Sequence, residues 1–167
     1  MPVYTELLAE LKHEATGTRK MLEKVPDEKL LWKPHEKSMS LGRMATHIAD
    51  IPVWAERILL ADEFDFSKAA YKTIPTASVR EILERFDKRL HEAVTLLETT
   101  SDEKLNQPFT LRSGEKIFFT LPKKVVLRNF AFNHIYHHRG QLSVYLRLLD
   151  IAVPGMYGPS ADEIRAV

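Results

Sequence analysis

The sequence predicts an all-α protein, a four-helix bundle with a short extended segment before its fourth helix. Two observations predict this fold class. Four stretches of roughly 20 to 28 residues repeat apolar residues at three- and four-residue intervals, which is the period of an amphipathic helix. The chain has 167 residues, enough for one substantial core and too few for two. We therefore expect residues 1–167 to form a single domain.

The first predicted helix ends before Pro26, and the second runs from Ser40 to about Ala61. The apolar side of the first helix is formed by Tyr4, Leu7, Leu8, Leu11, Ala15, Thr18 and Leu22. Serine at position 40 is a favourable N-cap. Pro52 lies inside the second helix, and because proline has no N–H it should free the carbonyl of Ile48 and kink the helix.

Capping residues also mark the third and fourth predicted helices. Ser78 is followed three residues later by Glu81, which is a capping box, and helical spacing continues to Glu98. The fourth helix should begin near Pro122, a residue favoured in the first helical turn, and continue to about Asp150.

A short hairpin or extended loop is predicted between the third and fourth helices. The stretch PFTLRSGEKIFFTL, residues 108–121, has strand-like residues on both sides of Ser113 and Gly114. The other two connections have about 15 residues each, long enough to cross a bundle, so spacing alone leaves the helix order open.

Composition limits the possible partners. The formal net charge is +1, from 24 basic and 23 acidic residues, which gives no electrostatic reason to expect nucleic acid or an anionic membrane. The chain has no cysteine, so any thiol chemistry must use a thiol brought by a substrate. The first residues lack the apolar run of a signal peptide, and no stretch is long and apolar enough to span a membrane, so we expect a cytoplasmic protein.

The stretch FNHIYHHRGQ, residues 132–141, holds three of the seven histidines. His134 and His138 are four residues apart, about 6 Å of rise and roughly 40° of rotation on a helix, so both rings leave one face. The residues that share this direction are Leu127, Ala131, Gln141 and Tyr145. Because two buried neutral imidazoles need several polar partners, a shared metal ion is the better explanation of an inward pair.

Two neighbouring residues leave alternatives open. His137 lies about 80° from this direction, and a pair formed by His134 and His137 is the main competitor for the ligand identity. Arg139 points away from the pair. It is either solvated or helix-capping, or it contacts an anionic substrate or a partner helix.

A third metal ligand is expected from the second helix. His47 is flanked by apolar residues there, and with the inward pair it completes a set of three imidazoles from facing helices. Three neutral ligands leave open coordination positions, as in catalytic sites, and suit Zn²⁺, while Ni²⁺, Co²⁺, Fe²⁺ or Mn²⁺ also fit. Asp50 and Gln141 are spaced to orient the ligand histidines.

These motifs resemble the DinB-like (DinB/YfiT) superfamily of metalloenzymes. The resemblance rests on the early inward histidine, on the stretch from His134 to Gln141, and on the tail VPGMYGPSADE. It implies a four-helix bundle in up-down-down-up order, a homodimer, and a metal held by His47, His134 and His138. Characterised relatives use low-molecular-weight thiols such as bacillithiol, mycothiol or glutathione.

The leading hypothesis is therefore a metal-dependent thiol S-transferase acting in detoxification or stress response. The metal would ionise a thiol that attacks an electrophile, with Tyr145 or Tyr157 lining the pocket. A metal-assisted hydrolase is a close variant. The alternatives from other classes are a metal-binding stress or interaction protein without catalysis, and a dimeric scaffold whose histidines bind no metal.

Overall fold

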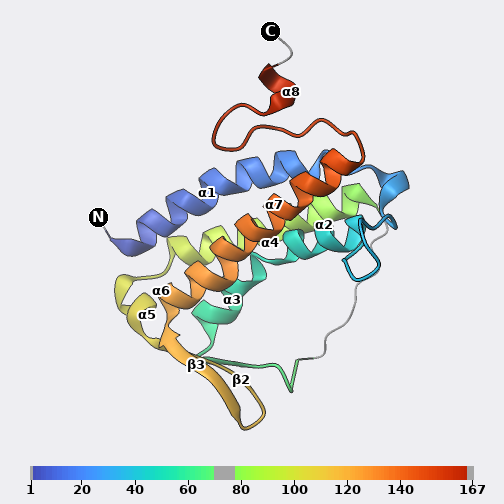
Figure 1. Ribbon diagram of the computed structural model, residues 1–167. Helices are drawn as coiled ribbons and strands as arrows, with labels where there is room; N and C mark the ends of the chain where they lie inside the picture. Colours follow the sequence, from blue (N-terminus) through green and yellow to red (C-terminus); the bar gives the residue numbers. More distant parts are fainter. Residues whose placement is uncertain (1, 70–77, 165–167) are drawn as a thin grey trace.

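The computed structural model describes residues 2–69 and 78–164, and it is mostly helical. The long helices form one body, and the β-hairpin projects from one end of it (Figure 1). The helices of this body are α1 (Val3–Leu22), α2 (Leu41–Asp50), α3 (Val53–Leu60), α4 (Val79–Glu98), α6 (Lys123–Leu127) and α7 (Asn133–Leu148). The shorter elements are η1 (Asp27–Lys29), α5 (Asp102–Asn106) and α8 (Ala161–Ile164).

A small sheet makes the all-α prediction wrong in part. Its strands, in the order β1-β2-β3, are β1 (Glu63–Asp65), β2 (Pro108–Ser113) and β3 (Lys116–Pro122). The hairpin of β2 and β3 is the predicted one, and Gly114 turns it with a φ of 58°. The sequence analysis missed β1, which pairs parallel to β2, because three residues are too few to show an alternating pattern.

The first and third helices match their predictions, whereas the second is divided. The side chain of Ser78 caps α4 by accepting from the N–H of Glu81, and Ser40 caps α2 in the same way. Two helices, α2 and α3, replace the single kinked helix that we expected, because Pro52 brings no N–H. The N–H of Ile51 bonds to the carbonyls of His47 and Ile48 at the end of α2.

The fourth predicted helix is also interrupted. Between α6 and α7 lies a π-helical turn, η2 (Arg128–Phe132), in which the N–H of Asn133 bonds to the carbonyl five residues back, on Arg128. The prediction of one regular helix from Pro122 to Asp150 is therefore wrong at this turn. A π-turn adds one residue to a helical turn, and spacing rules for α-helices do not reveal it.

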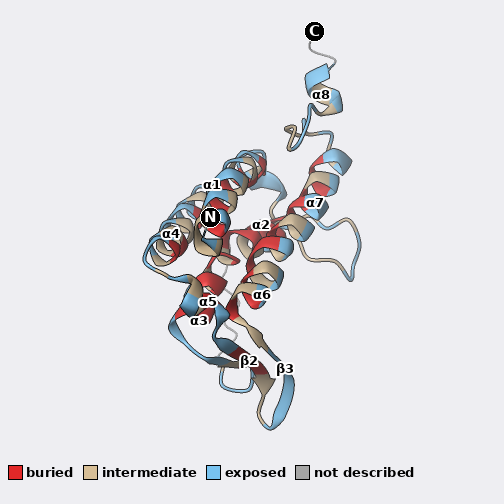
Figure 2. Cartoon of the chain, turned by 90° about the vertical axis from the view of Figure 1, so that its left-hand side faces the viewer, coloured by how far each residue is buried: buried red, intermediate tan, exposed pale blue. Residues whose placement is uncertain are grey.

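Buried residues lie on the sides of the helices that face one another (Figure 2). They form two apolar clusters. One lies near the sheet, where Trp54 and Ile58 of α3 meet Phe109 and Phe132. The other is formed by α2, α4 and α7 and by the end of α1, and includes Met44, Ile48, Phe86 and Leu142. Helix α2 contacts both α4 and α7, so one side of α2 lies next to α7. In the part of the chain described, no helix has the length and apolar character needed to cross a bilayer.

Candidate metal centre

Three histidines from two helices converge between α2 and α7. His47 comes from α2, and His134 and His138 come from successive turns of α7. One potential ligand atom from each ring lies within 4.8 Å of the other two. The Nε2 atoms of His47 and His134 are 3.0 Å apart, and the ring of His47 lies 4.5 Å from that of His138, centroid to centroid.

This geometry fits a divalent transition metal. Zn–N bonds of about 2.0–2.1 Å place the nitrogens of a tetrahedral site about 3.3 Å apart, close to the 3.0 Å between Nε2 of His47 and Nε2 of His134. All three rings are half-buried. Desolvation is the main cause that lowers the pKa of each ring, and it lowers the pKa of His47 to about 4, with further lowering by His138 and His134. At neutral pH the rings are therefore uncharged, as metal ligands must be.

One of the three rings is held by a hydrogen bond outside the cluster. The Nδ1 atom of His138 lies 2.7 Å from Oε1 of Gln141, the contact that the three-residue spacing predicted. Such a bond fixes the orientation and tautomer of a ligand histidine and leaves its other nitrogen free for a metal. At His134 the backbone carbonyl of Phe130 favours the charged ring and opposes the lowering of its pKa by burial.

Comparisons with known proteins place the chain in a family. A model of the DinB family matches residues 1–165. The chain belongs to the DinB family. It is 29% identical over 151 residues to YrdA, an uncharacterised protein of Bacillus subtilis (strain 168), and the match covers 90% of this chain and 85% of that protein.

Two crystal structures show the same fold, each with a TM-score of 0.71. A DinB-like protein of Bacillus subtilis, YjoA, is 20% identical, and the match covers 93% of this chain and 99% of YjoA. A DinB-like protein of Bacillus cereus ATCC 10987 is 28% identical, and the match covers 90% of this chain and 95% of that one. The resemblance inferred from the histidine motif is thereby confirmed at the level of the family and the fold.

The other predicted residues of this DinB-family chain lie in different surroundings. Asp50 faces α4, where its carboxylate pairs with Arg85 at 3.2 Å. Tyr145 is buried, its hydroxyl donates to the carbonyl of Met39 at 3.3 Å, and its ring packs edge-on against Trp32. Both therefore have structural partners of their own.

His137 and Arg139 lie on different sides of α7, one exposed and the other buried. His137 is exposed and packs against the ring of His138 at 4.8 Å, outside the cluster of three. Arg139 is only 4% exposed, so a solvated role for it is wrong. Its guanidinium pairs with the Glu14 carboxylate of α1 at 2.7 Å and also donates to the Glu14 carbonyl at 3.1 Å.

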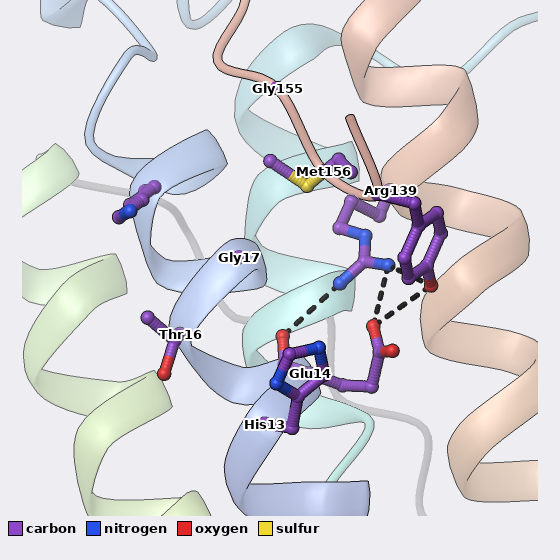
Figure 3. Close-up of a pocket in the computed structure, with 9 residues that line it drawn as sticks. His13, Glu14, Thr16, Gly17, Arg139, Gly155 and Met156 are labelled. Atoms are coloured by element: carbon purple, nitrogen blue, oxygen red, sulfur yellow. Dashed lines mark hydrogen bonds and ion pairs between the residues drawn. The ribbon is translucent and has the colours of Figure 1, made fainter. Parts of the chain in front are cut away.

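Tyr157 contacts the ion pair formed by Arg139 and Glu14. Figure 3 shows the pocket between α1 and the C-terminal segment. The Tyr157 hydroxyl, which lines this pocket, contacts both Arg139, at 2.6 Å, and Glu14, at 2.9 Å. Burial and the hydrogen bond to Glu14 raise the pKa of Tyr157. The pocket is lined by residues of α1, Arg139 and the tail, and none of the three clustered histidines lines it.

Sequence reasoning missed Glu14, which shapes the second of these sites. Glu14 lies more than a hundred positions from Arg139, and one sequence gives no indication of such a pair. A buried arginine in α7 would have pointed to a partner carboxylate, but its burial became visible only with the fold.

Proposed function

We propose that this protein binds a divalent transition metal through His47, His134 and His138 and uses it to transfer a low-molecular-weight thiol to an electrophile. The convergence of three uncharged, half-buried imidazoles supports this proposal. Zinc and nickel are the metals that we propose first, because both accept imidazole ligands and a soft sulfur. A bound cation of this kind supplies Lewis acidity that lowers the pKa of a coordinating thiol.

The residues of the chain have three tasks in this reaction. The imidazoles hold the cation without adding negative charge, so its full +2 charge acts on the thiol. Gln141 keeps the ring of His138 oriented. Half-burial excludes part of the solvent while leaving an approach for the substrates. In the transfer itself the thiol loses its proton to solvent, its sulfur forms a bond to carbon, and the leaving group departs with the electron pair.

A metal analysis and a conjugation assay test the proposal together. The untagged protein should contain or take up zinc or nickel. It should then conjugate chlorodinitrobenzene with bacillithiol, mycothiol or glutathione, releasing chloride. His138→Ala should lose both properties, whereas His137→Ala, which changes the neighbouring exposed ring, should keep them.

Two outcomes separate the alternatives. Metal binding with equal conjugation rates in wild type and His138→Ala would identify a metal-binding protein without this catalysis. A protein that takes up no transition metal at all would remove the metal centre. We also propose the homodimer expected from the family resemblance, which light scattering of the purified protein measures.

A further inference from the structure

Arg43 lies one helical turn before His47 on α2. Residues four apart on a helix share a face and differ by about 6 Å in rise, so Arg43 lies on the side of α2 that carries His47. Two contacts give the direction of α7 along this side. The hydroxyl of Tyr145 donates to the carbonyl of Met39, just before α2, and His134 meets His47 farther along α2. Helices α2 and α7 therefore run antiparallel.

The position of Arg43 between these two contacts places it beside the histidine cluster. It lies midway between them on α2, so it is level with the middle of α7 between them, where Gln141 follows His138 on one side of the helix. Arg43 and Gln141 are both exposed, whereas the three histidines are half-buried. Burial is the main cause that lowers the pKa of His47, and the charge of Arg43 contributes to the lowering, as expected of a nearby cation. Arg43 thus lies at the solvent-facing edge of the cluster.

The guanidinium of Arg43 has no anionic partner among the described residues. Its backbone N–H caps onto Ser40, but no described carboxylate pairs with its side chain. Every other arginine in the described part of the chain pairs with a carboxylate or, as Arg57 does, packs over aromatic rings. The carboxylate of Asp50, on the same helix, is already paired with Arg85. Since a guanidinium forms two parallel hydrogen bonds to a carboxylate, Arg43 can bind an anionic group of a ligand at the edge of the cluster.

We propose that Arg43 binds a carboxylate of the thiol substrate, so that the site selects thiols that carry a carboxylate a few bonds away from the sulfur. This inference rests on the thiol transfer proposed above and adds the class of its substrate. A thiol held at the histidines meets Arg43 if its carboxylate lies about one helical turn, or 6 Å, away. A cysteinyl thiol followed by one further residue covers this span, at about 3.5 Å per residue. Arg43 is then a specificity-determining residue and takes no part in bond making.

Glutathione and its diethyl ester test this contact, because the ester keeps the thiol and loses both carboxylates. Calorimetry of the zinc-loaded full chain measures the dissociation constant of each. The preference of the wild type for glutathione over the ester should fall about 5-fold in Arg43→Gln, the upper range for a solvent-exposed Arg–carboxylate pair. The matched control, Arg80→Gln, removes the same charge from α4, where the side chain is 82% exposed, and should keep the wild-type preference.

The outcomes separate this contact from the transfer reaction. An unchanged preference in Arg43→Gln would overturn the proposal, as would an equal fall in Arg80→Gln or no binding of glutathione to the wild type. Zinc affinity, measured by chelator competition, should not fall in Arg43→Gln; a 5-fold fall would show that the change acts on the histidines instead and would also overturn the proposal. If the wild type binds glutathione through Arg43 but conjugates no electrophile, the contact stands and it is the proposed transfer that fails.

Discussion

The ion pair between Glu14 and Arg139 provides a stability test that is worked directly from the structure. The two side chains are 11% and 5% exposed, and they meet at 2.7 Å between α1 and α7. Glu14→Ala leaves the buried guanidinium with only neutral partners, among them the hydroxyls of Thr18 and Tyr157. Breaking a buried pair from one side costs about 3–5 kcal/mol. For a chain of this length each kcal/mol shifts Tm by about 2–4 °C, so we expect a loss of roughly 6–20 °C.

Urea denaturation of the metal-free protein measures this cost, and two variants serve as controls. The double variant Glu14→Leu/Arg139→Met should recover most of the stability, because it removes both charges together. Glu98→Ala breaks the pair with Lys12. Because the side chains of Glu98 and Lys12 are 47% and 52% exposed, this change should cost about 1 kcal/mol or less. If Glu14→Ala costs no more than Glu98→Ala, the buried pair does not hold α7 against α1 as we argue.

Three further predictions concern the histidine cluster. Zinc at about 100 times its dissociation constant should stabilise the protein by about 2.7 kcal/mol in a thermal shift assay, and His47→Ala should show no such gain; an unchanged wild-type Tm would contradict the metal centre. The pKa of His47 is lowered from 6.5 to about 4, mainly by desolvation, so folding favours the neutral ring. The contribution of His47 to the stability of the metal-free protein should therefore be fully present above pH 6.5 and be lost as the pH falls from 6.5 toward 4. Urea midpoints measured across this range give the dependence of stability on pH, and His47→Gln should make this dependence weaker. Gln141→Leu removes the acceptor beside Nδ1 of His138 and should weaken zinc binding about 10- to 100-fold in chelator competition; an unchanged affinity would show that Gln141 does not orient the ring.

Local signals explain which parts of the fold could be predicted. Helices α1 and α4 follow from apolar spacing, and the cap of α4 at Ser78 follows from residue type, because these signals lie within one turn of the chain. Pro52 was predicted to kink a single helix, and in the structure it separates two helices, α2 and α3. Strand β1 and the pair of Glu14 with Arg139 depend on segments far apart in sequence, so no local pattern predicts them.

The cluster of three histidines was predictable even though the fourth helix was not. His134 and His138 both lie on α7, after the π-turn, so the phase error introduced by η2 does not change their relative direction. His47 lies on α2, before the break at Pro52. Each of the three histidines therefore belongs to an uninterrupted helical segment in which spacing rules hold. The same rules placed Gln141 beside His138 correctly, but they gave no sign of the π-turn before His134. We conclude that residues within a regular helix can be assigned to a cluster from spacing, whereas an irregular turn of the backbone becomes visible only with the fold.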